Sequence, residues 1–409
     1  MKSSVASPLK AIGIAILCCV GLVLLVGLLN PARLNPPVKS DFVQDYFLAR
    51  AVISGVNPYL PLNELGERFG VPDEILHSST HPPSFAVLCL PFGLLSFQQA
   101  AFLWLILGLL SLSISLWLLF IKGKMAALPV IFLAAIAWPP VWFDLSLGQL
   151  MIPQLLLLTL AWRALRSRRD VVGGLLLGLT ISIKLIVWPL LLLLLFKRRD
   201  RAFLAASGVI ALMNFIAVLL IGIDPVFTYY LSNGKQIASI YSNNAFNFSA
   251  WTIGARLFAG TKTVDAAWFH TAPLIDAPAL VQLTSLICIG IILVYAFLVA
   301  LKAQDFDTSF AVLVSTSVIV SPVAWIFYLT LLLLPFAKLY KVRDWKTHGI
   351  IGLALLAPFV SQAVLPIFGA YSSFVIALLL VVPLGAVLLL IGGLHYEEKK
   401  AYKPHTIRP

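Results

Sequence analysis

Residues 11–29 read AIGIAILCCVGLVLLVGLL, an uncharged apolar run long enough to cross the roughly 30 Å hydrocarbon core of a bilayer as one helix. Similar runs recur along the 409-residue chain, in which 60% of the residues are hydrophobic and only 11% are charged. This composition excludes a soluble fold and predicts an all-α polytopic membrane protein. The run at 11–29 follows Lys2 and Lys10 and is too long for the core of a signal peptide, so we expect a retained first span.

Lysine and arginine gather in short connectors between the apolar runs, and the positive-inside rule places these connectors in the cytoplasm together with both termini. Most acidic residues fall on the opposite side. The net charge of +12 is therefore expected to lie on the cytoplasmic side of the protein, where it meets anionic lipid head groups. It gives no reason to expect binding of nucleic acid. The basic connectors are Lys122 with Lys124, residues 163–169, residues 197–201, Lys302, residues 338–346 and the tail after Glu397.

Two consequences follow from this charge placement. Residues 171–196 lie between two cytoplasmic clusters, so they are predicted to form two short helices that meet at a turn near Lys184. The apolar stretch 82–95, which His81 precedes, is predicted to be a juxtamembrane or re-entrant helix. We thus expect one transmembrane domain over 1–409 with about twelve spans, near 10–29, 99–120, 126–141, 150–165, 171–183, 185–197, 201–222, 279–301, 308–320, 323–341, 347–366 and 372–394.

Two long outer loops, 30–81 and 223–278, stand out among short connectors, and loops of that length in a compact chain are usually functional or disordered. The first contains SDFVQDYFLARAVISGVNPYLP, in which Phe42, Tyr46 and Ala49 recur at helical spacing. Asp41 stands just before this pattern, and Gly55 follows it. The loop is therefore predicted to hold an ordered helix that begins after Asp41.

The second loop contains YSNNAFNFSAWTIGARLF, where aromatic residues alternate with amides. Planar amides suit sugar hydroxyls, and sugar ring faces stack on Trp or Tyr. The alternative is that Tyr241, Trp251 and Trp268 only anchor the chain at the membrane surface, as Trp and Tyr do in most membrane proteins.

Several polar residues are expected at or near the outer membrane surface. They are Asp144 and Gln149 in WFDLSLGQ, Lys184 in SIKLIVWP, and Ser321 with Trp325 in SPVAWIFY. A lysine between apolar runs is costly, which makes Lys184 a candidate site residue, with snorkelling to the surface as the alternative. For Asp41 and Asp45 the alternative is a helix N-terminal carboxylate favoured by the helix dipole. The four cysteines, Cys18, Cys19, Cys89 and Cys288, match no ligand spacing and are expected to pack within helices.

Six stretches in this order resemble bacterial glycosyltransferase family 87 of the GT-C superfamily. They are SDFVQDYFLARAVISGVNPY, HPPSFAVLCLPFGLL, LSLGQLMIPQLLLLTLAW, GGLLLGLTISIKLIVWPLLLLLLFKRR, SNNAFNFSAW and SPVAWIFYLTLLLLP, within roughly residues 38–340. The resemblance implies a GT-C fold, a polyprenyl-phosphate sugar donor, and a catalytic Asp at the position of Asp41, with Asp45 in reserve. Mannosyltransferase members often read SPxxWxHH in the last motif, whereas this chain has Phe327 and Tyr328 there, so the sequence does not name the sugar.

The function expected from the resemblance is transfer of a hexose, such as mannose, to a lipid or glycan acceptor on the non-cytoplasmic face of a bacterial plasma membrane, with inversion. No metal or other cofactor is required in principle, because a monophosphate leaving group carries less charge than a nucleotide diphosphate. Alternatives are a transporter or flippase, which would commonly show repeats and mid-membrane ionisable residues, and a polymerase or ligase of lipid-linked glycans. Besides Asp41 and Asp45, the predicted substrate-binding residues are His81, Asp144, Gln149, Lys184, Asn243, Asn244, Asn247, Trp251, Arg256, Trp325 and Tyr328.

The charge map gives a testable topology. The Asp41 loop, Asp144, the 223–278 loop and Ser321 should lie on one face of the membrane, opposite Lys122, Arg166, Arg199 and Arg343, because the basic connectors stay in the cytoplasm. Accessibility labelling of single cysteines placed at these positions measures the side. Labelling of positions 41 and 166 from the same side would contradict the map.

Overall fold

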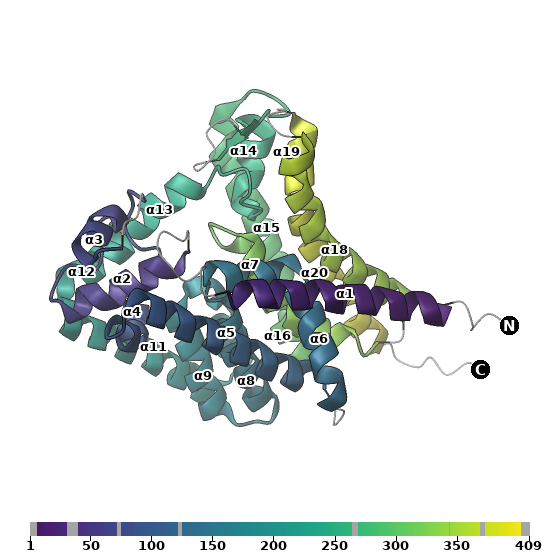
Figure 1. Ribbon diagram of the computed structural model, residues 1–409. Coiled ribbons are helices and arrows are strands. Elements are labelled where there is room, and N and C mark those ends of the chain that lie inside the picture. The colour runs from purple at the N-terminus through teal and green to yellow at the C-terminus, as the bar shows by residue number, and fades with distance from the viewer. Residues whose placement is uncertain are drawn as a thin grey trace, which may run out of the picture. The chain divides into compact units, whose positions relative to one another are not determined.

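The computed structural model describes residues 6–30, 40–71, 75–121, 125–263, 269–342, 344–368 and 373–401. Lys122, Lys124, Trp268 and Arg343, which entered the sequence analysis, lie outside these ranges. The described chain is almost entirely helical (Figure 1). It divides into two compact units, one of residues 1–160, 178–185 and 207–235, the other of residues 161–177, 186–206 and 236–409.

The first unit contains the helix that was predicted to begin after Asp41, together with the segments around it. Helices α8 (Met151–Arg166), α9 (Asp170–Ile183), α11 (Asp200–Ile221) and α13 (Gly234–Tyr241) have residues in both units. The other helices of the first unit are α1 (Ala6–Leu28), α2 (Phe42–Ile53), α3 (Leu62–Phe69), α4 (Pro83–Gly93), α5 (Phe97–Phe120), α6 (Leu128–Ile136), α7 (Pro139–Leu147) and α12 (Ile223–Thr228).

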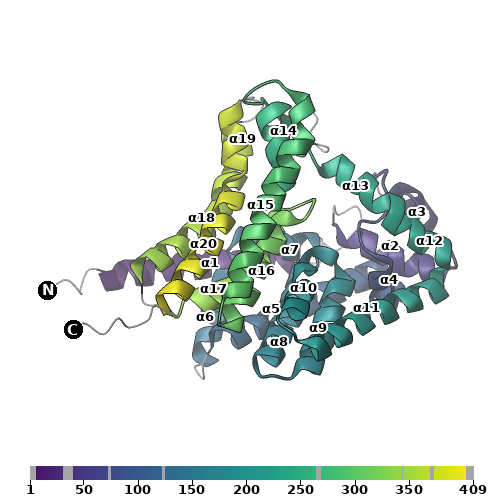
Figure 2. The ribbon, with the colours of Figure 1, turned by 180° about the vertical axis from the view of Figure 1, so that it is seen from behind.

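The second unit contains the remaining helices, of which α18 and α20 pack side by side in both ribbon views (Figure 2). A two-stranded antiparallel hairpin pairs β1 (Thr261–Lys262) with β2 (His270–Thr271). The helices are α10 (Pro189–Phe196), α14 (Ile253–Phe258), α15 (Val281–Lys302), α16 (Phe306–Val320), the 3-10 helix η7 (Ile326–Leu332), α17 (Leu333–Leu339), α18 (Trp345–Phe368), α19 (Phe374–Leu380) and α20 (Val382–Ala401).

Five helical segments of the described chain are long and apolar enough to cross a membrane, and seven are if each of two bent helix pairs counts as one span. They lie at 11–28, 97–120, 200–221, 278–302 and 345–364, with bent pairs at 125–147 and 374–401. Five other apolar helices have only 10–17 residues. The chain therefore has the helices of an all-α multi-pass membrane protein, while the count of about twelve spans is not confirmed.

The predicted break near Lys184 is present. Helix α9 ends at Ile183, and a 3-10 turn over Leu185–Val187 follows before α10 begins at Pro189. The side chain of Gln154 on α8 donates from Nε2 to the carbonyls of Thr180, at 3.1 Å, and Lys184, at 3.0 Å. Lys184 follows the last residue of α9, so this buried amide stabilises the break from a neighbouring helix.

Helix α2 also forms where the sequence predicts it and packs against α4. Phe42 and Phe47 on α2 are fully buried. Arg50 at the far end donates from Nη1 to the carbonyl of Gly93 at 3.1 Å, and the Tyr46 hydroxyl donates to the carbonyl of Leu95 at 3.2 Å. Because an α-helix leaves its last carbonyls without intrahelical partners, these two bonds attach the C-terminal end of α4 to α2.

The close approach of α2 and α4 requires a glycine at position 93. A Cβ built there would lie 2.8 Å from the backbone carbonyl carbon of Ala49 and 2.8 Å from Ile53 Cδ1. We expect Gly93→Ala to destabilise the protein by about 1–3 kcal/mol, since the two backbones must move apart. The measurement is the midpoint of thermal unfolding in detergent.

Gly290→Ala is the matched control, because nothing lies within 4 Å of its Cβ position in α15. It should leave the midpoint unchanged or raise it, since alanine is the better helix former by about 1 kcal/mol. Equal effects of the two substitutions would show that α2 and α4 do not depend on their close contact.

Candidate active site

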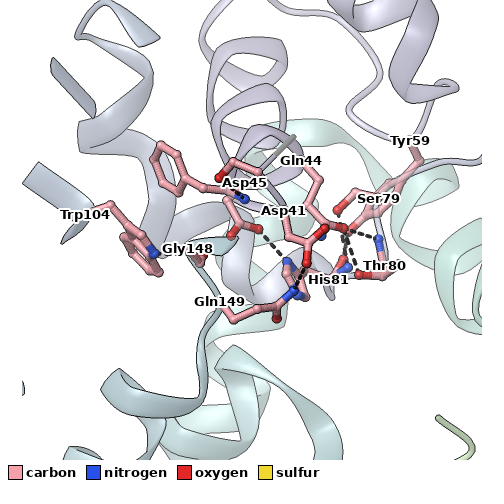
Figure 3. A network of polar contacts seen from close by, with 12 residues as sticks. Asp41, Gln44, Asp45, Tyr59, Ser79, Thr80, His81, Trp104, Gly148 and Gln149 are labelled. Carbon is pink, nitrogen blue, oxygen red and sulfur yellow. Dashed lines mark hydrogen bonds and ion pairs between the residues drawn. The ribbon is translucent and has the colours of Figure 1, made fainter. Parts of the chain in front are cut away.

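The N-terminal turn of α2 presents three polar side chains to one side of the helix, Asp41, Gln44 and Asp45 (Figure 3). Residues three and four apart share a helix face. Asp41 occupies the N-cap position, yet its carboxylate makes no capping bond to the helix backbone. The helix-dipole alternative does not account for the contacts of either carboxylate, because each carboxylate bonds to a side chain from elsewhere in the first unit.

Asp45 bonds to His81. The carboxylate Oδ1 lies 2.5 Å from Nδ1 of the imidazole, and both side chains are 1% exposed. The ring is further placed by Phe85, whose ring packs edge-on at 5.5 Å. The Tyr59 hydroxyl donates to the His81 carbonyl at 3.0 Å. Residues of the NPY segment and of α4 thus hold His81 against α2.

Gln44, which the sequence analysis did not select, holds the same connector. Its Oε1 accepts hydrogen bonds from the backbone N of Thr80 at 3.0 Å and from the Thr80 hydroxyl at 2.8 Å. The Tyr229 hydroxyl donates to the Thr80 carbonyl at 2.9 Å. The signal that could have indicated Gln44 is its spacing from Asp41 and Asp45 on the helix. Its role is to place His81, one residue after Thr80.

Asp41 bonds to Gln149, whose Nε2 donates to Oδ2 at 2.5 Å. Gln149 lies in the turn between α7 and α8, after Gly148, which ends α7 in the left-handed conformation with φ 69°. A Cβ at Gly148 would lie 2.8 Å from Phe42 Cβ, so glycine is needed both for the turn and for its approach to α2. Trp104 fixes the turn by donating from Nε1 to the Gly148 carbonyl at 2.9 Å.

Asp144 is buried beneath this turn and caps the next helix. Its carboxylate accepts from the backbone N of Met151 at 2.9 Å and of Ile152 at 3.3 Å. A carboxylate at a helix N-terminus satisfies free N–H groups and is favoured by the dipole. The structure therefore gives Asp144 a role in shaping the turn that carries Gln149. Substrate contact by Asp144 stays a prediction.

Part of Asp41 remains accessible to solvent, but burial by the surrounding protein still raises the pKa of its carboxyl above the ordinary value. The hydrogen bond from Gln149 and the positive charges of Lys184 and His81 oppose this rise, while the charge of Asp45 adds to it. Lys184 therefore lies within electrostatic range of Asp41.

Two buried polar atoms at this place have no hydrogen-bond partner among the described residues, Nε2 of His81 and Oε1 of Gln149. His81 is the side chain that binds Asp45, and Gln149 is the side chain that binds Asp41. Because Nε2 of Gln149 donates to Asp41, Oε1 is an acceptor. The first unit thus brings together six predicted site residues: Asp41, Asp45, His81, Asp144, Gln149 and Lys184.

The amide-rich loop lies in the second unit, where Asn247 serves the fold. Its Oδ1 accepts from the backbone N of Ser249 at 3.0 Å and of Ala324 at 2.8 Å. Its Nδ2 donates to the carbonyls of Tyr241 and Pro322, both at 3.1 Å. The side chain is fully buried and joins the SNNAFNFSAW segment to the SPVAW segment. These bonds leave Asn247 little capacity for a sugar.

Arg256 is also used internally. Nη2 donates to the carbonyls of Ala245 at 2.8 Å and Asn247 at 3.0 Å, and Nη1 donates to the carbonyl of Ala377 at 3.0 Å. Burial lowers the pKa of its guanidinium to about 10. These donors connect the loop to α19, and substrate binding by Arg256 stays a prediction.

The other predicted residues of the second unit lie close to this network. Asn244 is buried and its Oδ1 accepts from the backbone N of Phe246 at 2.9 Å, whereas Asn243 is exposed. Trp251 donates from Nε1 to the carbonyl of Val320 at 3.0 Å. Trp325 and Tyr328 stand at the start of η7, and the Trp325 ring packs edge-on to Tyr241 at 5.6 Å.

Within the described residues no group of three or more His, Cys, Asp or Glu side chains is arranged to hold a metal ion. What the first unit offers instead is a carboxylate of raised pKa, a nearby ammonium group, a histidine held by a second carboxylate, and an unpartnered amide oxygen. A carboxylate and cations in one place suit proton abstraction from a hydroxyl beside an anionic group.

Comparison with known proteins supports a family assignment. An alpha-(1->3)-arabinofuranosyltransferase of Mycobacterium tuberculosis strain CDC 1551 is 30% identical over 243 residues, 55% of this chain and 55% of the relative, and the protein of that name in strain H37Rv gives the same values. The chain thus spans about half the length of the curated relatives it matches. The search of solved structures found no significant match.

The sequence model of glycosyltransferase family 87 matches residues 80–322, a range that contains His81, Gln149 and Lys184 and begins after Asp41 and Asp45. Asp45 is nevertheless tied to the matched range by its bond to His81, and Asp41 by its bond to Gln149. Because the match covers more than half of the 409 residues, the chain belongs to glycosyltransferase family 87.

Proposed function

We propose that the protein is a membrane glycosyltransferase that moves a sugar from a polyprenyl-phosphate donor to a hydroxyl of a lipid or glycan acceptor, on the non-cytoplasmic face and with inversion. The observation that carries this proposal is Asp41, a carboxylate at a helix start that makes no capping bond. It is held instead by Gln149 and lies in the field of Lys184.

In the proposed reaction Asp41 takes the proton of the acceptor hydroxyl while the hydroxyl oxygen bonds to the anomeric carbon. The bond from that carbon to the phosphate oxygen breaks, and its electron pair leaves with the lipid phosphate. One base and one displacement invert the anomeric centre. The raised pKa of Asp41 supports this role, because a general base works best when its pKa approaches the working pH.

The leaving phosphate gains negative charge as its bond to the sugar breaks. A fixed cation nearby stabilises that charge more in the transition state than in the ground state. Lys184 supports this part of the proposal by its place at the break between α9 and η3, where it lies within electrostatic range of Asp41. The Gln154 bond to the Lys184 carbonyl keeps that break in place.

A small hollow beside the start of α2 joins apolar walls to polar residues. Its walls come from α1, α5 and α7, and they include the apolar residues Leu28, Phe97 and Leu105, with Ser40 and Gly148 at the same place. Gly148 precedes Gln149, the partner of Asp41. An apolar surface next to a polar site suits a ligand that joins a lipid to a sugar through a phosphate.

The sugar is decided by a direct assay. Resemblance to polyprenol-phosphate-mannose-dependent members favours a hexose, whereas the relatives named above are arabinofuranosyltransferases. Purified protein is incubated with radiolabelled polyprenyl-phosphate mannose, glucose and arabinofuranose, together with a membrane lipid extract as acceptor. Transfer from one of these donors is the expected result. Label that crosses a vesicle membrane without transfer would favour the transporter alternative.

Asp41→Asn should abolish transfer, because the amide keeps the shape of the carboxylate but cannot accept the proton. Loss of a general base typically costs a factor of about 10² to 10⁴ in rate. Asp45→Asn should cost less, since Asp45 acts on His81 rather than on the acceptor. Initial rates of both variants, with thermal unfolding as a check of folding, give the comparison. A residual rate above a tenth of wild type in Asp41→Asn would exclude it as the base.

Gln149→Ala should move the acid limb of the kcat/KM profile to higher pH. The Gln149 hydrogen bond lowers the pKa of Asp41, so its loss raises that pKa further, and a base of higher pKa is ionised only at higher pH. Gln99→Ala, which removes a capping contact on α5, is the control and should leave the limb unchanged. An acid limb at the same pH in Gln149→Ala and in wild type would show that Gln149 does not affect the pKa of Asp41.

A further inference from the structure

His81 carries a polar atom that the proposed base mechanism does not use. The residue is 1% exposed, its Nδ1 is held by Asp45, and its Nε2 has no hydrogen-bond partner among the described residues. A buried donor or acceptor left without a partner costs about 1–3 kcal/mol. Such an atom next to a candidate site has a hydrogen bond to give to a ligand or a water.

The surroundings decide which form of the imidazole is favoured. An ionised carboxylate only accepts, so Nδ1 carries a hydrogen toward Asp45. The ring bonds to Asp45 and its charge acts on Asp41, both of α2. The Tyr59 hydroxyl bonds to the His81 carbonyl, while Lys184 acts on Asp41 and Cys89 of α4 is coupled to Asp45. If the imidazole also carries a hydrogen on Nε2, it is a cation beside the Asp45 carboxylate and Nε2 is a donor.

We propose that His81, as an imidazolium held by Asp45, donates its Nε2 hydrogen to a phosphate oxygen of the lipid-linked donor and of the lipid phosphate that leaves. This role rests on the proposed function and adds a second cation to Lys184. The donor phosphate then accepts from two sides. A hydrogen bond between two charged groups is roughly twice as strong as a neutral one.

The two unpartnered atoms suit different parts of the substrates. Oε1 of Gln149 is an acceptor beside Asp41, so it fits a hydroxyl group. Nε2 of His81 in the charged form is a donor and fits an anion. Figure 3 shows the His81, Asp41 and Gln149 side chains facing one another. The proton would therefore leave toward Asp41, and the phosphate would leave toward His81.

The test measures binding of farnesyl phosphate, a short polyprenyl monophosphate, to the full-length protein in detergent from about pH 6 to pH 9.5, a range over which an imidazolium loses its proton. The readout is the ratio of the Kd of His81→Gln to that of wild type. We expect about tenfold or more near pH 6 and a fall toward one at high pH, because only the imidazolium is a charged donor. Using the ratio cancels the titration of the ligand itself.

Farnesol and inorganic phosphate separate the parts of the ligand. Farnesol lacks the phosphate, so its ratio should stay near one, while inorganic phosphate should show the same pH trend with weaker binding. His77→Gln is the matched control, a histidine of the same connector whose Nδ1 lies 2.7 Å from the carbonyl of Ser78. Its ratio should stay near one at every pH.

A ratio near one throughout, a ratio that does not change with pH, or an equal loss for farnesol would overturn the role of His81. If His81→Gln does not fold, Asp45→Asn carries the test. It keeps the imidazole but removes the carboxylate that favours a cation beside it, so affinity should fall more at neutral pH than at about pH 6. Equal affinity of Asp45→Asn and wild type at both pH values would likewise overturn the role.

Different results would refute the proposed function and the role of His81. Wild-type protein that binds neither farnesyl phosphate nor any polyprenyl-phosphate sugar, and transfers none, would refute the donor class. Wild-type protein that transfers sugar but shows a flat ratio in His81→Gln would refute only the role of His81.

Discussion

Burial of carboxylate groups at the start of α2 is the constraint on which the first unit depends. Removing a carboxylate from water is costly unless hydrogen bonds or a cation compensate it. Asp45 therefore needs His81, and Asp41 needs Gln149, so the connector before α4 and the turn after α7 must both lie against α2. The glycine at 148 and the cap made by Asp144 follow from this need, because they let the turn approach and hold its shape.

The second unit applies the same physical rule to backbone groups. Buried backbone N–H and C=O groups that lie outside helices need hydrogen-bond partners. Asn247 and Arg256 supply such partners to the loop at 245–249 and to the segments at 322–324 and 377. Amide and arginine side chains that look suited to sugars and phosphates in the sequence thus stabilise the loop. The chemistry of a residue type does not by itself say whether it faces a ligand or the fold.

Most elements of the fold lie where apolar periodicity and charge placement predict them. The break at Lys184 and the helix after Asp41 are examples, and both rest on local signals, a lysine between apolar runs and a helical pattern with a turn residue after it. The number of spans was not obtainable in this way. Several apolar runs form helices of only 10–17 residues, and 125–147 bends by 79° between its two helices. Hydropathy measures how apolar a run is, not whether its helix continues straight.

An α-helical membrane protein of family 87, with a helix in the first loop and two acidic residues at the start of that helix, follows from the amino-acid sequence alone. The pairing of Asp45 with His81, of Asp41 with Gln149, and of Gln44 with Thr80 is visible only in the folded chain, as are the backbone hydrogen bonds of Asp144, Asn247 and Arg256. The reason is physical. Periodicity reports which face of one helix is buried, whereas a hydrogen bond between residues 36 or 108 positions apart depends on distances and angles set by the packing of several elements together.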